Sequence, residues 1–324
     1  MPLAELQASL EANKQWLPIR PFLGKGGTVG GLVALGACGP ERLRYGAARD
    51  LLLGLRFVSG KGKLVSTGGR VVKNVAGYDL GRLLAGSAGT LGFLTDLTLR
   101  VSSRPESCRA VRGCGPPEGI LGVARELLRS NMDPAFVVAD PVNGSASGPQ
   151  AERKGALWRI TAGFEGFGET VEAQVKRCTG LFAGSDLKAE PSKEYVPCHG
   201  VFEDEEESLG RFPFLLRADL PVDKVMGFVK VTAETVTVEG LLVDLGCGRV
   251  RAGISDLSGQ VWEALCGHAR ALAGHILLEK APDAFKRHRD VFGPPQPSWN
   301  VMGRIKDALD PSNIFSPGSL PGRK

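Results

Sequence analysis

The spacing of apolar residues predicts secondary structure along the first third of the chain. In residues 3–13 three leucines stand three or four positions apart, which predicts a short amphipathic helix. The segment DLLLGLRFVSGKGKLVSTGG contains two strand-like runs around a Gly-Lys-Gly turn at residues 60–62, and we interpret it as a β-hairpin. One more strand is predicted within GTLGFLTDLTLRVSSRP, where three leucines alternate with polar residues.

The second half of the chain alternates helix-like and strand-like segments. Apolar residues recur at helical spacing in residues 118–130, ETVEAQVKRCTGLF, VDKVMGFVKVTAE and SGQVWEALCGHARALAGH. Strand patterns occupy residues 135–139, ALWRITAGFEG, FPFLLRADL, GLLVDLGCGRVRAGI and ILLEK. This β-α-β-β-α-β order is typical of a ferredoxin-like antiparallel sheet with helices on one face, so we expect an α+β fold. A last helix, in VMGRIKDALDPSNIF, is expected to end at Asp310-Pro311.

Two segments are unusually rich in glycine, a residue that is costly to order inside regular structure. KNVAGYDLGRLLAGSAGTLGFLT, residues 73–95, contains five glycines, and GGTVGG occupies residues 26–31. Neither is a dinucleotide-binding fingerprint between a strand and a helix, and the chain contains no P-loop motif. The glycines therefore indicate either turns with positive φ or backbone that approaches a ligand. Glycine content alone favours turns but leaves both interpretations open.

Side chains with obvious chemistry are sparse. Tyr78 and Asp79 could present a hydroxyl and a carboxylate to a ligand, or Asp79 could form a turn or cap a helix. The four histidines are isolated and lack the spacing of a metal site, and no serine lies in a GxSxG context. We therefore expect neither a metal site nor a catalytic residue in this chain.

Composition and charge narrow the class of protein. Apolar residues make up 43% and charged residues 23%, as in an ordinary soluble globular protein. The net charge of +5 is uneven, because residues 41–112 hold thirteen Lys and Arg against five Asp and Glu. A buried anionic ligand or an acidic partner surface explains this excess of positive charge as well as nucleic acid would. Because aromatic residues are not interleaved with the basic ones, we expect no nucleic acid partner. The acidic run at residues 203–207 is predicted to be a solvated loop.

Cysteine usage and hydropathy indicate the compartment. The seven cysteines are scattered and form no CxxC pair, which is typical of free thiols in a reducing environment. Charges interrupt the apolar residues at the N-terminus, so no signal peptide is predicted, and no run approaches the ~20 apolar residues of a membrane span. We expect a cytoplasmic protein that does not insert into the membrane directly, although partners could hold it at the inner face.

Four motifs, taken in order, resemble one family of flavoprotein subunits. They are GGTVGG, GPERLRYGAARDLLLGLRFVSGKGKL, GGRVVKNVAGYDLGRLLAGSAGTLGFLTDLTL and LDPSNIFSPG. The chain resembles the GlcE family, the FAD-binding subunits of bacterial glycolate oxidase, within the vanillyl-alcohol oxidase/PCMH superfamily. The match runs from about residue 3 to the end of the chain and is densest over residues 24–101.

The resemblance implies an α+β fold with two domains. Residues 1–105 would be the second lobe of a PCMH-type FAD-binding domain. Residues 106–324 would be a ferredoxin-like cap domain, with a C-terminal tail that returns to the FAD domain. In the family a further N-terminal lobe grips the FAD pyrophosphate with a glycine-rich loop. The chain begins after that lobe, so we expect the first lobe and roughly half of the FAD contacts to be missing.

The resemblance also implies the cofactor and its contacts. FAD would lie against the backbone of residues 26–31 and of the strand entry at residues 89–95, with Tyr78 and Asp79 nearby. The implied cofactor-binding residues are Gly26, Gly27, Thr28, Gly30, Gly31, Gly36, Gly39, Tyr78, Asp79, Gly89, Thr90, Leu91, Gly92, Leu94 and Thr95.

The resemblance also implies a function: the chain would be one subunit of a 2-hydroxyacid dehydrogenase complex that acts on glycolate or lactate. The chain would relay electrons through FAD beside a catalytic GlcD-like flavin subunit and a GlcF-like iron–sulfur subunit. We expect substrate oxidation in the partner, because the sequence suggests no histidine base and no arginine pair that could clamp a carboxylate. The alternative is a flavin-free structural subunit of the same complex, whose basic residues 41–112 dock on acidic partner surface.

Overall fold

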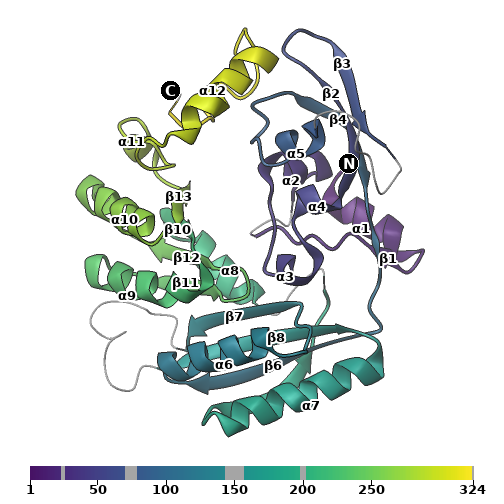
Figure 1. The fold of residues 1–324 in the computed structure, drawn as a ribbon, viewed down its shortest axis with the longest axis vertical. Coiled ribbons are helices and arrows are strands. Elements are labelled where there is room, and N and C mark those ends of the chain that lie inside the picture. The colour runs from purple at the N-terminus through teal and green to yellow at the C-terminus, as the bar shows by residue number, and fades with distance from the viewer. Residues whose placement is uncertain (23–25, 70–78, 143–156, 198–201, 323–324) are drawn as a thin grey trace. The chain divides into compact units, whose positions relative to one another are not determined.

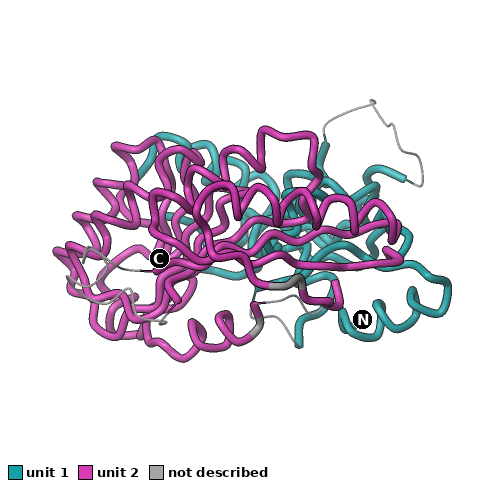
Figure 2. The backbone as a smooth tube through the Cα atoms, turned by 90° about the horizontal axis from the view of Figure 1, so that it is seen from below, with its two compact units in different colours: residues 1–104, 295–324 teal, residues 105–294 magenta. Residues whose placement is uncertain are grey.

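The computed structural model describes residues 1–22, 26–69, 79–142, 157–197 and 202–322 (Figure 1). The chain folds into two compact units, which Figure 2 shows in different colours. Unit 1 combines Met1–Arg104 with Pro295–Lys324, and unit 2 consists of Pro105–Pro294. The chain thus leaves unit 1 after residue 104 and returns to it with its last thirty residues.

Unit 1 combines short helices with a small antiparallel sheet. Its helices are α1 (Leu3–Glu11), α2 (Val29–Leu35), α3 (Arg42–Tyr45), α4 (Ala48–Leu51), α5 (Leu80–Leu84) and α12 (Ser298–Leu309). Its strands are β1 (Gln15–Trp16), β2 (Leu52–Val58), β3 (Leu64–Gly68), β4 (Phe93–Leu99) and β5 (Ser102–Ser103). Strands β3, β2 and β4 form one sheet in that order, and β1 pairs with β5. The antiparallel pairing of β2 with β3 confirms the predicted hairpin.

Two apolar clusters stabilise unit 1. The first contains buried residues of α2, α4 and the segment after β1, and the three leucines of α1 pack against it, which confirms the predicted amphipathic helix. The second cluster lies on one face of the sheet and consists of Leu55, Phe57, Leu84 and Leu91. Ile305 and Leu309 of α12 pack against this second cluster. The C-terminal helix is therefore part of the core of unit 1, although it follows almost two hundred residues of unit 2.

Unit 2 is built on one eight-stranded sheet. Its strands are β6 (Ser107–Gly115), β7 (Phe136–Pro141), β8 (Trp158–Gly166), β9 (Lys188–Glu194), β10 (Phe214–Asp219), β11 (Gly240–Asp244), β12 (Arg249–Ile254) and β13 (His275–Lys280). Its helices are α6 (Pro117–Arg129), α7 (Gly168–Gly184), α8 (Glu203–Gly210), α9 (Val225–Thr235), α10 (Gly259–Ala271) and α11 (Asp283–Lys286), with a 3₁₀ turn at Val222–Lys224.

The sheet consists of two ferredoxin-like halves joined side by side. The strand order is β13-β10-β12-β11-β7-β8-β6-β9, and every pairing is antiparallel. The first half follows the chain order β6-α6-β7-β8-α7-β9, and the second follows β10-α9-β11-β12-α10-β13. Each is one β-α-β-β-α-β unit. The predicted α+β arrangement is confirmed, and it occurs twice, with β11 pairing to β7 between the halves.

Helices α7 and α9 lie on one face of this sheet, and a row of charged residues lies on the other. Residues that pair directly across strands share a face. One row of paired residues is Gly113, Ile160, Ala139, Val243 and Val250. A methyl group added at Gly113 would meet Phe182 of α7, and Val250 lines a small void with Val229 of α9, so these helices cover this face. The neighbouring row contains Arg112, Thr161, Val138, Asp244, Arg249 and Asp219, and so carries charge on the other face.

Several elements differ from the sequence predictions. Strands β6 and β9 were not predicted, because arginines interrupt the first and Pro191 lies in the second. The short helix α2 was not predicted either, because it begins within the glycine-rich GGTVGG segment. The prediction of a solvated loop at residues 203–207 was wrong, since they begin helix α8, in which Glu206 is buried and Glu205 pairs with Arg159. A run of like charges does not exclude a helix when tertiary partners take up part of the charge.

Candidate functional site

A cavity with a volume of about 760 Å³ lies within unit 1. That size is within the range of about 300–1,000 Å³ in which proteins hold small molecules. Its lining comprises eleven apolar residues, four glycines and three residues with hydroxyl side chains. No side chain among these lining residues carries a charge. The cavity therefore suits a flat and largely apolar group with a few polar atoms at its edge.

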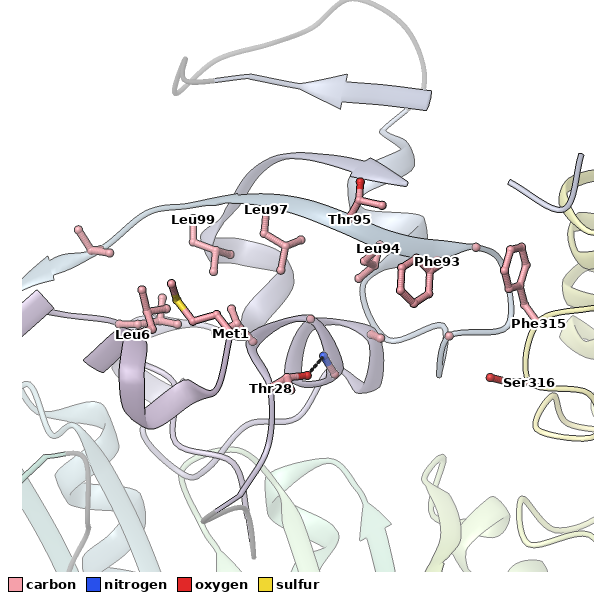
Figure 3. A pocket seen from close by; sticks show the side chains of 18 residues that line it. Met1, Leu6, Thr28, Phe93, Leu94, Thr95, Leu97, Leu99, Phe315 and Ser316 are labelled. Atoms are coloured by element: carbon pink, nitrogen blue, oxygen red, sulfur yellow. Dashed lines mark hydrogen bonds between the residues drawn. The ribbon is translucent and has the colours of Figure 1, made fainter. Parts of the chain in front are cut away.

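The floor of the cavity is the start of helix α2 (Figure 3). Thr28 is the N-cap of α2, and its hydroxyl oxygen accepts a hydrogen bond from the backbone N–H of Gly31 at 3.1 Å. Gly30 and Gly31 follow in the first turn and line the cavity. Because these two residues have no side chains, the backbone of this turn is open to whatever occupies the cavity.

Strand β4 forms the opposite wall. It is an edge strand of the three-stranded sheet, since β2 is its partner there. Figure 3 shows Leu97 and Leu99 pointing from β4 toward the side of the cavity that carries Met1 and Leu6. Thr95 points away in the same view, and its hydroxyl donates to the Arg56 carbonyl at 3.1 Å. The wall that faces the cavity is accordingly apolar.

The C-terminal tail closes one end of the cavity. Phe315 and Ser316 line it beside Phe93, as Figure 3 shows. The tail is held by Asp310, whose carboxylate accepts hydrogen bonds from the backbone N–H of Ile314 at 3.0 Å and of Phe315 at 2.8 Å. Sequence reasoning included this tail in the family resemblance but assigned none of its residues to the site.

Some of the predicted site residues line the cavity and others do not. Those in its lining are Thr28, Gly30, Gly31, Gly89, Gly92, Leu94 and Thr95. Gly26, Gly27, Gly36, Gly39, Asp79, Thr90 and Leu91 are described but are not among the lining residues. Tyr78 lies outside the described residues. Asp79 caps helix α5, its carboxylate accepting from the backbone N–H of Arg82 at 3.0 Å, which accounts for this residue without a ligand.

Packing within the chain explains several of the predicted glycines. Gly36 ends α2 in the left-handed conformation with φ of 61°, and a methyl group there would lie 3.1 Å from the Cα of Gly86. At Gly39 a methyl group would lie 2.5 Å from Oε2 of Glu41, and at Gly92 it would lie 2.6 Å from the ring of Phe57. These glycines are required by close approaches inside the fold.

Gly30 differs from those positions. A methyl group added at Gly30 meets open space, and its φ lies outside the left-handed region. Glycine at a helical position costs up to about 1 kcal/mol relative to alanine. Neither packing nor backbone conformation accounts for a glycine here, and the residue lines the cavity. A ligand that lies against the backbone would account for it.

Comparison with known proteins identifies the family. The family model described as FAD binding domain matches residues 1–68. The glycolate oxidase subunit GlcE of Escherichia coli K12 is 46% identical over 98% of this chain and 79% of its own length. The chain belongs to the GlcE family. Its expected fold class and its FAD-binding domain are thereby confirmed, and FAD is the cofactor of that domain.

Other known proteins match the GlcE-family chain less closely. The glycolate oxidase subunit GlcD of Bacillus subtilis is 38% identical over 31% of this chain and 21% of its own length. A D-lactate dehydrogenase of Archaeoglobus fulgidus is 27% identical over 90% of this chain and 69% of its own length. Among solved structures, an alkyldihydroxyacetonephosphate synthase superposes with a TM-score of 0.69 at 15% identity, over 98% of this chain and 62% of that one. That likeness shows the shared fold.

The cavity fits one part of FAD better than another. The isoalloxazine ring is flat, largely apolar and polar at its edge, which agrees with the apolar walls, the open backbone at Gly30 and the hydroxyls of Thr28 and Ser316. The pyrophosphate is anionic and needs convergent N–H donors or cations, and no side chain in this lining is charged. The residues present therefore fit the ring end of the cofactor.

Unit 2 contains a separate cluster of charges that sequence reasoning missed. Arg217, Arg249 and Arg251 lie on the neighbouring strands β10 and β12, although no arginine pair was expected. Their charges are engaged by carboxylates: Arg249 pairs with Asp219 at 2.6 Å and Arg251 with Glu279 at 2.9 Å. Strand register brings these residues together, and their spacing along the chain does not reveal it.

The described residues also bear on two other kinds of site, for metal ions and for membranes. Within residues 1–22, 26–69, 79–142, 157–197 and 202–322, no group of three or more His, Cys, Asp or Glu side chains could hold a metal ion. In the same part of the chain, no helix is long and apolar enough to cross a membrane.

Proposed function

We propose that this chain is the FAD-holding subunit of a multi-subunit dehydrogenase that oxidises a 2-hydroxyacid such as glycolate or lactate. The chain would relay electrons from a catalytic GlcD-like flavin subunit to a GlcF-like iron–sulfur subunit. The 46% identity to a relative named as a glycolate oxidase subunit supports this role, as do partial matches to a GlcD subunit and to D-lactate dehydrogenases.

The observation that carries the proposal is the cavity beside Gly30. Backbone at Gly30, Gly31 and Gly89 would lie against the ring, and the hydroxyls of Thr28 and Ser316 would meet its polar edge. The leucines of β4 would exclude water from the ring. When bound, FAD supplies the capacity to accept and release electrons, which no side chain of this lining has.

Substrate oxidation is assigned to the partner subunit. Proton abstraction from a hydroxyacid needs a positioned base such as histidine or a carboxylate. The side chains that line the cavity include no titratable group. The three arginines of unit 2 do not substitute for a carboxylate clamp in this proposal, because Asp219 and Glu279 already engage them.

A flavin-free assembly subunit is the second candidate. It is favoured by one observation, the lack of charged side chains in the cavity lining that could neutralise a pyrophosphate. In that case the excess of Lys and Arg in residues 41–112 would serve to dock acidic partner surface, and high salt should loosen the complex.

The experiment that separates the two candidates is a flavin count. The complex is purified with its partners, its flavin is released, and the amount is compared with the amount of each subunit. We expect two flavins per heterotrimer, one in this chain and one in the catalytic subunit. A single flavin would reject the proposed role and favour the assembly subunit.

A further inference from the structure

Helix α12 carries a lysine that is almost completely buried. The side chain of Lys306 is 2% exposed. Its ammonium group donates to the carbonyl of Thr90 at 2.8 Å, to the carbonyl of Phe315 at 2.8 Å and to the carboxylate of Asp310. An ammonium has three protons to donate. Each of them has an acceptor here, so the position of this group is fully specified by its surroundings.

Asp310 completes the same cluster from the other side of the ion pair. Its carboxylate accepts from Lys306 and from the backbone N–H groups of Ile314 and Phe315. Burial alone would raise the pKa of Asp310, but the hydrogen bond from Lys306 and the two backbone N–H groups hold it below its usual value. Asp310 is therefore held as the carboxylate, and both side chains have their hydrogen bonds satisfied.

This ion pair connects two segments that are far apart in the sequence and that both line the cavity. Thr90 follows Gly89, and its hydrogen bond to Lys306 spans 216 residues. Phe315 and Ser316 form the end wall of the cavity in Figure 3. A methyl group at Gly89 would lie 3.4 Å from the hydroxyl oxygen of Ser316, so the two segments are also close to each other.

We propose that Lys306 and Asp310 are positioning residues for the flavin, which fix the Gly89 turn against the Phe315–Ser316 wall. This inference rests on the proposed function, because it takes the cavity as the flavin site. A buried ion pair adds little net stability compared with an apolar pair of the same volume. The pair also fixes the position of the backbone around the cavity. Its hydrogen bonds hold two carbonyls, of Thr90 and Phe315, and two N–H groups, of Ile314 and Phe315.

The variants Lys306→Met and Asp310→Asn break the pair from either side. Each leaves a buried charge or polar group without its partner and should lower the melting temperature. The double variant Lys306→Met/Asp310→Leu removes both charges and should recover the part of that loss that an unpaired charge causes. The part caused by the carbonyls and N–H groups that lose their partners should remain. If the pair positions the wall, the double variant will still bind FAD at least tenfold more weakly than the wild type. In the double variant, part of the thermal stability would then be regained while FAD affinity would not. A pair that only stabilised the fold would not produce this difference.

Glu41→Gln is the matched control. Glu41 pairs with Arg20 at 3.0 Å, the two side chains are 2% and 6% exposed, and both belong to unit 1. Neither residue is among those that line the cavity. We expect this variant to lose thermal stability as the single variants do, while its affinity for FAD stays at the wild-type value.

The measurement combines FAD titration of the full chain with hydrogen exchange of the flavin-free protein. In the pair variants, peptides that cover residues 86–92 and 312–318 should exchange faster than in the wild type and in Glu41→Gln. Wild-type affinity for FAD in the double variant, or unchanged exchange in both segments, would overturn the inference alone. A wild-type chain that binds no FAD would overturn the proposed function, and with it this inference.

Discussion

Glycines in this chain serve different purposes, and the neighbours of each one identify its purpose. Gly36 and Gly86 come together where the turn after α5 contacts the end of α2, and Gly92 leaves room for the ring of Phe57. Replacing any of these would disturb the fold itself. Gly31 and Gly89 are also poor probes of binding, because a side chain at Gly31 would crowd the Thr28 cap and Gly89 has a φ of 69°. Gly30 alone of these positions is free of such demands.

The first prediction concerns Gly30→Leu. Leucine is a better helix former than glycine and meets open space at this position. We expect the flavin-free variant to be as stable as the wild type or more stable, by up to about 1 kcal/mol. Its side chain would occupy the cavity, so FAD affinity should fall at least tenfold. Thermal unfolding and FAD titration measure the two effects separately.

Gly122→Leu is the control for that variant. Gly122 lies inside α6, is exposed, and also has open space where a methyl group would be added. It should gain similar helix stability and leave FAD binding unchanged. Full FAD affinity in Gly30→Leu would reject the assignment of the flavin ring to this cavity.

At the scale of elements, strand register brings opposite charges together on one face of the unit 2 sheet. Arg217 of β10 contacts both Asp219 and Glu279, while Arg249 and Arg251 of β12 each contact one of these carboxylates. Burial alone would raise the pKa values of Asp219 and Glu279. The neighbouring arginine charges and their hydrogen bonds hold both pKa values below the usual range.

The second prediction is that stability depends on pH in the direction set by these lowered pKa values. A carboxyl whose pKa is lower in the folded state adds stability above its unfolded value of about 4, and this stability is lost as the pH falls through the folded value. Glu279→Gln should therefore lower stability by about 1–3 kcal/mol at pH 7. The difference from the wild type should shrink below about pH 4.5. Thermal unfolding between pH 7 and 3.5 measures it.

The stability of Glu279→Gln must be compared with that of the wild type at each pH. Another carboxyl in unit 2 has a raised pKa, whereas the pKa of Glu279 is lowered. Burial raises the pKa of Asp140 to about 6, although Arg159 contacts it at 2.5 Å. That contribution is common to both proteins and cancels in the difference. A stability difference that stays constant down to pH 3.5 would mean that Glu279 is not stabilised in its ionised form by these arginines.

At the scale of the whole molecule, the C-terminal thirty residues belong to the unit that the chain leaves at residue 104. Ile305 and Leu309 pack against the second apolar cluster, and Gly60 donates its backbone N–H to the Leu309 carbonyl at 3.0 Å. Together with the Lys306 ion pair, these contacts make α12 and the tail a structural part of unit 1.

The third prediction is that removing residues 295–324 destabilises unit 1 selectively. Hydrogen exchange should accelerate in β2, α5 and the turn at residues 86–92, while β8 and β12 of unit 2 stay protected. Removing only residues 317–324 is the control, since it keeps every contact of Lys306, Asp310 and Phe315. Equal loss of protection in both units would show that the two units do not unfold independently of each other, although their contacts separate them.

How far the sequence predicted the fold depends on how local the determining interactions are. The leucines of α1 and the turn between β2 and β3 act within a few residues, and both elements were predicted correctly. Strands β6 and β9 carry arginines, glycine or proline and are stable only because β8 and β6 pair with them, so they were missed. Helix α2 was missed because its two glycines oppose helix formation, whereas the turn at residues 86–88 donates to its last carbonyls.

The candidate site divides in the same way. Glycine-rich segments and the family resemblance pointed to residues 26–31 and 89–95, and seven of the predicted residues line the cavity. The sequence could not separate Gly30, which the fold does not require, from Gly92, which it does, because the difference lies in atoms from other segments. Lys306 and Asp310 were missed because a lysine four residues before an aspartate usually indicates an exposed helical pair.

The sequence by itself determined the family, the α+β class and the alternation of helices and strands, because these depend on residue type and short-range spacing. Only the tertiary structure decided that the ferredoxin-like unit occurs twice and that charges gather on one face of its sheet. It also decided that the C-terminal tail forms a wall of the cavity. The physical reason is that strand pairing and the burial of Lys306 join residues up to 216 positions apart, and no local pattern in the chain records such contacts.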